Sequence, residues 1–290
     1  MKIIITGSKG QLGNEIQVLA KDYPDFEFIY TDIDELDITD RQKIDEYFAL
    51  HQPDIIINCA AYTAVDKAES DETTAYLINA KAVENLAKSA AGIGALMVHI
   101  STDYVFDGKS YLPYCESDQT NPQSAYGRTK LAGEEAVRRF AGKGLILRTA
   151  WLYSAFGNNF VKTMMKYGNE RDELNVVFDQ VGTPTYAWDL AKAILDILPA
   201  AVRQSGTETF HYSNEGVASW YDFARTIIAI SGIDCQINPI LTKEYPLPAP
   251  RPCYSVLDKS KIKEKYQIQI PYWSDSVKDC IQRLGELTHN

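Results

Sequence analysis

Short apolar runs rich in β-branched residues alternate with longer segments of helical periodicity over the first half of the chain. The apolar runs, which we expect to be strands, occupy 2–6, 26–32, 54–60, 96–101, 144–150 and 175–179. The segments with helical periodicity are 12–21, 41–50, 73–91 and 125–140. Most strand runs are apolar throughout, as in strands that are buried on both faces. Strands that alternate with helices form βαβ units, so we predict an α/β fold with a doubly wound parallel sheet.

The pattern becomes less regular after residue 151. Helices are expected at 159–167, 188–198, 219–231 and 274–287 and a strand at 209–213, whereas prolines at 239, 246, 248, 250 and 252 indicate extended chain. We therefore expect a first domain of residues 1–151 that is completed by a return segment of about 174–213. A smaller C-terminal lobe would take about 152–173 and 214–290.

Three evenly spaced glycines follow the first predicted strand, in the run GSKGQLG at 7–13. Glycine permits a tight turn, lets the backbone approach a pyrophosphate and lets the following helix pack closely on the strand. Amides at the N-terminus of that helix would face the phosphates. Because the turn comes directly after the first strand, it predicts a Rossmann-type domain that binds a dinucleotide. The expected contacts are Gly7, Lys9, Gly10, Gln11, Leu12 and Gly13.

Residues after the second and third predicted strands are placed to contact the rest of such a cofactor. Asp32 lies about 20 residues beyond the glycine turn, where a carboxylate meets the adenosine ribose hydroxyls and disfavours a 2′-phosphate. Lys9 in the turn offsets that charge, so both NADH and NADPH remain candidates. Asp37 and Ile38 suit the adenine edge, although a surface carboxylate is an alternative explanation. Cys59, Ala60 and Ala61 are small residues that would let the cofactor lie against the backbone. Ordinary close packing is the alternative explanation for them.

Charge and cysteine usage argue against other classes of function. A formal charge of −10 disfavours nucleic acid or an anionic membrane as the main partner. The five cysteines are scattered without the spacing of metal ligands, which indicates reduced thiols and no bound metal. The first strand and glycine turn leave no room for a signal peptide, and no apolar run approaches the roughly 18 residues that span a bilayer. We therefore expect a cytoplasmic protein without nucleic-acid or membrane partners.

Tyr126 and Lys130 lie four positions apart in a predicted helix and so share one face of it. An ammonium group beside a phenol lowers a pKa that is ordinarily near 10. Thr102 follows the predicted strand 96–101, at the sheet edge where ligands bind, although a strand-end cap would also explain it alone. Thr102 would bond a substrate oxygen, Tyr126 would protonate it as hydride arrives, and Lys130 would hold the nicotinamide ribose. YxxxK alone is common in helices; its combination with the glycine turn and Thr102 is a strong signal.

A succession of short motifs runs through nearly the whole chain. They are GSKGQLG at 7–13, AYTAVDKAE at 61–69, STDYVFDG at 101–108, YGRTKLAGE at 126–134, RTAWLY at 148–153, GNNF at 157–160, DQVGTPT at 179–185 and PRP at 250–252. Together they resemble the extended short-chain dehydrogenase/reductases and, within these, the dTDP-4-dehydrorhamnose reductases. The TDYVFDG and TAVDKAE segments are much more specific than YxxxK.

The resemblance implies that a dTDP-linked 4-keto-deoxyhexose, dTDP-4-dehydro-β-L-rhamnose, is reduced at C4 by NADPH or NADH to dTDP-L-rhamnose, the last step of its synthesis. Thr102, Tyr126 and Lys130 match the family's catalytic positions. The positions that match its sugar and nucleotide contacts are Val65, Thr102, Asp103, Tyr104, Trp151, Asn159 and Arg251. An arginine suits a diphosphate through forked donors, and an indole gives a hexose an apolar platform. The alternative explanations are a surface charge for Arg251 and core packing for Trp151.

Two other functions share parts of this pattern. A reductase or epimerase for another nucleotide-linked sugar would keep the same catalytic side chains and differ in the sugar pocket. A non-catalytic cofactor-binding subunit, as in the related methionine adenosyltransferase β subunit, would not need the complete set that this chain has. Some family members pair through carboxylate-bound magnesium, but here Trp188 and Asp189 stand where an acidic cluster would be expected. No metal-dependent dimer is predicted, and a homodimer of another kind is left open.

Overall fold

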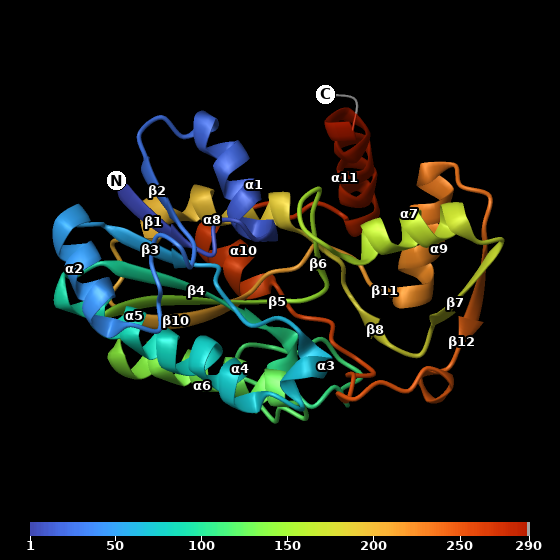
Figure 1. The fold of residues 1–290 in the computed structure, drawn as a ribbon, viewed down its shortest axis with the longest axis horizontal. Coiled ribbons are helices and arrows are strands. Elements are labelled where there is room, and N and C mark those ends of the chain that lie inside the picture. The colour runs from blue at the N-terminus through green and yellow to red at the C-terminus, as the bar shows by residue number, and fades with distance from the viewer. Residues whose placement is uncertain (289–290) are drawn as a thin grey trace.

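Six parallel strands form the central sheet of the computed structural model, which describes residues 1–288 (Figure 1). Their order across the sheet is β10-β5-β4-β3-β1-β2, and each neighbouring pair is parallel. The bounds are β1 Lys2–Thr6, β2 Glu27–Thr31, β3 Ile55–Asn58, β4 Leu96–Thr102, β5 Lys143–Thr149 and β10 Gly206–His211. The predicted Rossmann-type, doubly wound sheet is therefore confirmed.

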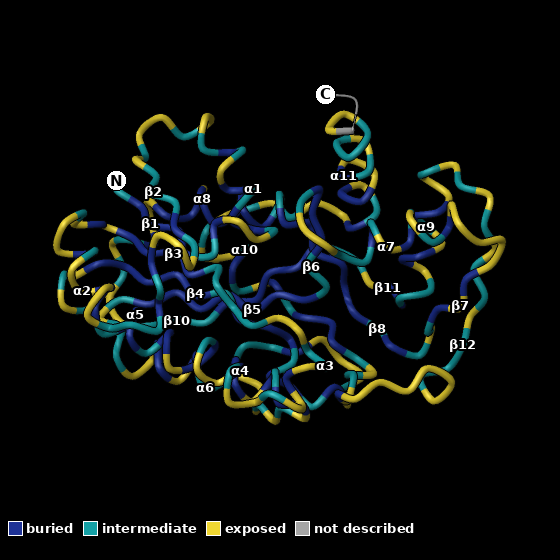
Figure 2. The backbone as a smooth tube through the Cα atoms, viewed as in Figure 1, coloured by how far each residue is buried: buried dark blue, intermediate teal, exposed yellow. Residues whose placement is uncertain are grey.

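Helices cover both faces of this sheet, which explains why its inner strands β1, β3, β4 and β5 are mainly apolar. On one face lie α1 (Gln11–Leu19), α8 (Ala187–Ala201) and α10 (Ser260–Tyr266), and on the other α2 (Arg41–His51), α5 (Ala82–Gly92) and α6 (Ala125–Phe140) (Figure 1). Successive residues of β1 enter opposite cores, since Ile3 and Ile5 pack on the first face and Ile4 on the second. Figure 2 shows the inner strands β1, β3, β4 and β5 as almost continuously buried, whereas the edge strands β2 and β10 are mostly of intermediate burial.

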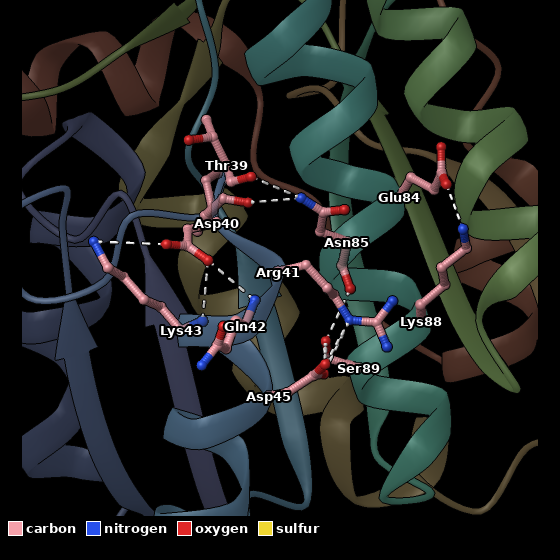
Figure 3. A network of polar contacts seen from close by, with 11 residues as sticks. Thr39, Asp40, Arg41, Gln42, Lys43, Asp45, Glu84, Asn85, Lys88 and Ser89 are labelled. Atoms are coloured by element: carbon pink, nitrogen blue, oxygen red, sulfur yellow. Dashed lines mark hydrogen bonds and ion pairs between the residues drawn. The ribbon is translucent and has the colours of Figure 1, made fainter.

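A polar network fixes the start of α2 against α5 (Figure 3). The Asp40 carboxylate caps α2 by accepting from the amides of Gln42 at 3.1 Å and Lys43 at 3.3 Å. From α5, the Asn85 amide donates to the Thr39 carbonyl at 3.0 Å. These contacts hold in place the chain that leads from the end of β2 to α2, which carries several predicted cofactor contacts.

The smaller lobe has its own core beside the central sheet. Its main helices are α7 (Phe160–Glu170), α9 (Trp220–Ser231) and α11 (Trp273–Thr288), packed around Tyr153, Phe223 and Trp273. Two strands, β7 (Glu173–Val177) and β12 (Gln236–Ile240), pair in parallel at its outer edge (Figure 1). The remaining short elements are α3 Val65–Ala68, α4 Glu72–Tyr76, β6 Leu152–Tyr153, β8 Val181–Gly182, β9 Thr185–Tyr186 and β11 Ala218–Ser219, with short 3-10 or π segments at Ala20–Asp22, Leu77–Lys81, Asp103–Val105 and Thr242–Glu244. No helix in residues 1–288 is long and apolar enough to cross a membrane.

The chain returns to the central sheet later than expected. We predicted a return segment from about residue 174, but β7 pairs with β12 instead of joining the large sheet. The return is made by α8, which packs on β1 and α1, and by β10, which pairs with β5. Apolar periodicity identifies β7 as a strand but carries no information about its partner, which lies about 60 residues away. The rest of the proposed domain division stays a prediction.

A buried ion pair joins α6 to the two strands beneath it. The Glu134 carboxylate of α6 accepts from Arg148 Nε and Nη2 of β5, both at 2.8 Å, and from the Ser101 hydroxyl of β4 at 2.6 Å. Both members of the pair are 2% exposed or less, and the partly exposed Arg138 adds a further bond at 2.7 Å. Removal of one partner from such a pair strands a charge in the core.

We therefore predict that Arg148→Met lowers the free energy of unfolding by about 3 kcal/mol, the low end for a broken buried pair, because Arg138 and Ser101 still contact Glu134. Arg128→Met is the matched control, since the Arg128–Glu72 pair is exposed and should contribute less than about 1 kcal/mol. Urea denaturation of both variants measures the difference. Equal losses of unfolding free energy in the two variants would show that the buried pair contributes no more to stability than the exposed one.

Candidate active site

A cavity of about 950 Å³ opens at the carboxyl ends of the central strands. Such an edge is where open parallel sheets bind their ligands. It collects residues that the sequence predicted from separate segments of the chain: Gly7, Gly10, Gln11, Leu12, Asp32, Asp37, Ile38, Cys59, Ala60, Ala61, Val65, Thr102, Asp103, Tyr104, Tyr126, Lys130 and Trp151. Four other predicted residues lie outside this lining: Lys9, Gly13, Asn159 and Arg251.

Two positions of the glycine turn have no room for a side chain. Gly7 has φ +63°, and a Cβ there would lie 2.6 Å from the Ala60 amide nitrogen. A Cβ on Gly13 would lie 2.5 Å from the Ser8 Cα, so this glycine lets α1 approach the turn without itself reaching the cavity. Among residues 1–288, no side chain caps the first turn of α1. Its N-terminal amides are therefore available to an anion such as a pyrophosphate.

Asp32 stands at the end of β2 with its carboxylate fixed toward the glycine turn. Asp32 Oδ2 accepts from the Lys9 amide at 3.1 Å, and Oδ1 accepts from the Ile33 amide at 2.9 Å. The ammonium group of Lys9 points away from the cavity lining and pairs with Asp34 at 3.0 Å and Glu35 at 3.5 Å. The backbone of Lys9 therefore lies in the glycine turn, as predicted. Its ammonium group is paired with carboxylates outside the cavity lining and does not offset the charge of Asp32 there.

Asp37 and Ile38 line the same end of the cavity, as predicted. Asp37 Oδ1 accepts from the amide and hydroxyl of Thr39 at 2.9 and 2.7 Å. These bonds lower the pKa of Asp37 below its usual value and hold its carboxylate in place.

Thr102, Tyr126 and Lys130 come together where β4 ends against α6. The Ser124 hydroxyl caps α6 by accepting from the Gly127 amide at 3.1 Å, which starts the helix just before Tyr126. The Thr102 hydroxyl donates to Asp103 Oδ1 at 2.9 Å and accepts from the Tyr104 amide at 3.2 Å, and Thr102 lines the same cavity as Tyr126. Lys130 Nζ donates to the Ile100 carbonyl at 2.6 Å.

On the side of the smaller lobe, the wall of the cavity is formed by two stacked tryptophans. The Trp151 and Trp220 rings stack with centroids 3.7 Å apart and an interplanar angle of 11°. Trp151 has φ +48°, an uncommon conformation for a bulky residue, and its ring also packs against Gly182, where a Cβ would lie 2.8 Å away. Strain of this kind persists only where the surroundings fix it.

Asn159 and Arg251 bond to protein groups in this structure. Asn159 Oδ1 caps α7 and its amide donates to Gln11 Oε1 at 3.1 Å, so the adjacent Asn158 lines the cavity instead. Arg251 Nη2 pairs with Asp66 Oδ2 at 2.6 Å. Arg251 lines a smaller cavity of about 190 Å³ that shares Tyr104 with the large one.

Comparison with known proteins agrees with this geometry. Residues 1–286 match the family model described as the RmlD substrate binding domain. A dTDP-4-dehydrorhamnose reductase from Sinorhizobium fredii is 40% identical, with 98% of each chain covered. The chain belongs to the dTDP-4-dehydrorhamnose reductase family. A solved reductase from Clostridium acetobutylicum is 48% identical with a TM-score of 0.94, covering 98% of this chain and 100% of that one. The Bacillus anthracis reductase, solved in complex with NADP, is 38% identical with a TM-score of 0.92, covering 97% of this chain and 99% of that one.

Burial dominates the electrostatics of this reductase-family site. It raises the pKa of Tyr126 to about 12, although the nearby Thr102 hydroxyl acts to lower it. Burial lowers the pKa of Lys130 to about 8, against the opposing charge of Glu134, and raises that of Asp103 to about 6. We had expected Lys130 to lower the pKa of Tyr126. In this structure its ammonium bonds the Ile100 carbonyl, and the phenol stays firmly protonated.

Several lining residues of the family site were missed by sequence reasoning, among them Thr149 and Trp220. Thr149 lies beside Thr102 in the β4–β5 register, and its hydroxyl is buried without a hydrogen-bond partner in residues 1–288. Strand register could have paired the two threonines. Nothing in the sequence connects Trp220 with Trp151, because their stacking depends on how the smaller lobe folds over the sheet.

Asp189, the position considered for magnesium, has structural partners in this chain. Its Oδ2 accepts from Asn214 at 2.7 Å and from the Ser276 hydroxyl. Within residues 1–288, no three His, Cys, Asp or Glu side chains are grouped to hold a metal ion.

The raised pKa of Asp103 predicts a pH-dependent stability. Because the folded protein binds this proton more tightly than the unfolded chain, the contribution of Asp103 to the free energy of unfolding falls as pH rises from about 4 to about 6. Asparagine carries no such proton. The free energy of unfolding of Asp103→Asn should therefore rise by about 3 kcal/mol relative to that of the parent over this pH range. Denaturant unfolding at several pH values measures the gain.

Asp107→Asn is the matched control for Asp103→Asn. Hydrogen bonds from Tyr114 and from the Lys109 amide lower the pKa of Asp107, so its variant should lose stability relative to the parent as pH rises. If the stability difference between Asp103→Asn and the parent is constant with pH, the raised pKa is excluded.

Proposed function

We propose that this protein uses NAD(P)H to reduce the C4 ketone of dTDP-4-dehydro-β-L-rhamnose, giving dTDP-L-rhamnose in the last step of dTDP-rhamnose synthesis. The observation that carries the proposal is the convergence of Thr102, Tyr126 and Lys130 in one cavity with the glycine turn. Membership of a family whose named relatives are reductases of this substrate supports the same reaction.

The cavity suits a nicotinamide dinucleotide along its length. The steric closure at Gly7 and the open N-terminus of α1 form a cradle for the pyrophosphate, with Gly10, Gln11 and Leu12 beside it. Asp32 and Asp37 would bind the adenosine end, and the backbone of Cys59–Ala61 would lie along the cofactor. The bound cofactor supplies the hydride that reaches C4.

The protein's own side chains supply the proton and the orientation. With its pKa at about 12, Tyr126 carries a proton at neutral pH and can deliver it to the C4 oxygen as negative charge develops there. Thr102, which lines the same cavity, would turn its hydroxyl from Asp103 toward the same oxygen. Lys130 would bond the nicotinamide ribose and favour the tyrosinate that remains.

The smaller lobe, residues 152–173 and 214–290 in our division, would hold the nucleotide sugar. Trp151, backed by Trp220, would give the sugar ring an apolar wall, with Val65, Asp103 and Tyr104 around it. Arg251 would exchange Asp66 for the diphosphate, to which its fork can donate two bonds. Asn159 would act through the loop that it fixes, placing Asn158 at the cavity. The unpaired cysteines support a cytoplasmic location, and a homodimer stays a prediction.

Loss of the phenol should stop the chemistry and spare binding. Tyr126→Phe is expected to lower kcat by about 10²–10⁴, the usual contribution of a positioned proton donor, with little change in cofactor affinity. The oxidation of NAD(P)H followed at 340 nm with the dTDP-sugar measures this. Tyr153→Phe is the matched control, because Tyr153 is a buried tyrosine in the core of the smaller lobe and does not line the cavity. If Tyr126→Phe is as active as the parent, Tyr126 is not the proton donor. If the parent protein does not oxidise NAD(P)H with the dTDP-sugar, the proposed reaction is refuted.

The pKa of Lys130 predicts an alkaline limit to activity. Since burial lowers it to about 8, the ammonium group is lost above that pH and kcat/KM for the cofactor should decline there. Tyr126, whose pKa is about 12, should not contribute to this decline. In Lys130→Arg, whose guanidinium stays charged, the decline should move to higher pH even if the maximal rate falls. If the alkaline decline of kcat/KM occurs at the same pH in Lys130→Arg as in the parent, the decline belongs to another group.

A further inference from the structure

We infer that the adenosine end of this site selects NADH over NADPH, because the turn after β2, beside which the 2′-phosphate of NADPH would lie, carries three carboxylates and one already paired lysine. The inference rests on the proposed function only in that it takes the large cavity as the nicotinamide-cofactor site. It concerns the charge of this chain, and it applies whichever sugar is reduced.

Asp32 provides the first carboxylate and is not free to turn away. A carboxylate at the end of the second strand bonds the ribose hydroxyls of NAD, whereas NADP sites place an arginine near the 2′-phosphate. Asp32 lines the cavity, and the amides of Lys9 and Ile33 hold both of its oxygens. The amide of Asp32 itself donates to Glu35 Oε2 at 2.9 Å, which fixes the turn that follows β2.

The nearest cation is already neutralised. Lys9 Nζ pairs with Asp34 and Glu35, and the bond to Asp34 raises the lysine pKa above its usual value. Lys9, Asp32, Asp34 and Glu35 together carry a formal charge of −2, from one cation and three anions. A phosphate monoester near pH 7 adds roughly −1.5 to −2 more. Even if Lys9 moved to the phosphate, it would leave two carboxylates unpaired beside it.

The first cations after this turn, Arg41 and Lys43 in α2, also pair with carboxylates. Arg41 Nε pairs with Asp45 at 2.9 Å, and Lys43 Nζ lies 3.7 Å from Asp40, as Figure 3 shows. The residues that line the cavity within 1–288 include one Lys or Arg, and this is Lys130 at the catalytic end. The Bacillus anthracis relative was solved with NADP, so the scaffold of that protein accepts a 2′-phosphate. The selection proposed here comes from side chains, not from the fold.

Equilibrium binding tests the inference without turnover. Titration of the protein with NADH and NADPH, followed by quenching of tryptophan fluorescence, should show NADH binding at least about tenfold more tightly at low ionic strength. Adenosine 5′-monophosphate should likewise compete better than adenosine 2′,5′-bisphosphate. The ratio should shrink as salt is added, because these carboxylates are partly exposed. Equal or tighter binding of NADPH would overturn the inference.

A single variant, Asp34→Asn, removes the carboxylate that pairs most closely with the Lys9 ammonium and leaves Glu35 in place on the Asp32 amide. We expect it to tighten NADPH binding by about fivefold or more and to leave NADH binding nearly unchanged, because NADH has no charge at that position. Glu46→Gln, which removes an exposed carboxylate of α2 whose partner is Gln42, is the matched control and should alter neither affinity. An equal change for both cofactors, or none, would contradict the assignment.

The two proposals fail in different ways. Preferential binding of NADH without reduction of the dTDP-sugar would refute the proposed function and support the selectivity. Reduction of the sugar with a preference for NADPH would support the function and refute the selectivity.

Discussion

The buried carboxylate of Glu134 joins the three elements on which the catalytic geometry depends. It bonds Ser101 at the end of β4 and Arg148 in β5, and it lies on α6 one turn beyond Lys130. Two glycines let the helix come this close, since a Cβ on Gly127 or Gly133 would lie 2.3 or 2.2 Å from backbone oxygens of neighbouring segments. The distances between the phenol, the ammonium group and the strand end therefore follow from helix–sheet contact and not from a flexible loop.

Burial and charge act against each other throughout this site. Desolvation is the largest influence on the pKa of Tyr126, Lys130 and Asp103, and it favours the neutral form of each. Glu134 opposes this effect at Lys130 from within the core, whereas the adenosine end relies on exposed carboxylates that salt can screen. The same cavity thus has a catalytic end that is insensitive to salt and a cofactor end that is sensitive to it.

Much of this arrangement could be predicted from sequence because it depends on local patterns. Apolar runs identify strands, a glycine turn has a steric cause at Gly7, and i,i+4 spacing places Tyr126 and Lys130 together. The errors and omissions concern partners far apart in the chain. The pairing of β7 with β12, the stacking of Trp220 on Trp151 and the capture of Lys9 by Asp34 all depend on tertiary placement. Periodicity shows that a residue faces a partner, but it does not show which one.

The contact between Gly7 and Ala60 has a consequence for how the protein acquires its cofactor site. The turn after β1 is shaped against backbone about 50 residues later, at the end of β3. The first strand, turn and helix therefore do not make a self-sufficient phosphate cradle, because one wall of it arrives only when β3 joins the sheet. Affinity for a dinucleotide is in this sense a property of the assembled sheet, gained during folding with a long-range contact that local propensity cannot supply.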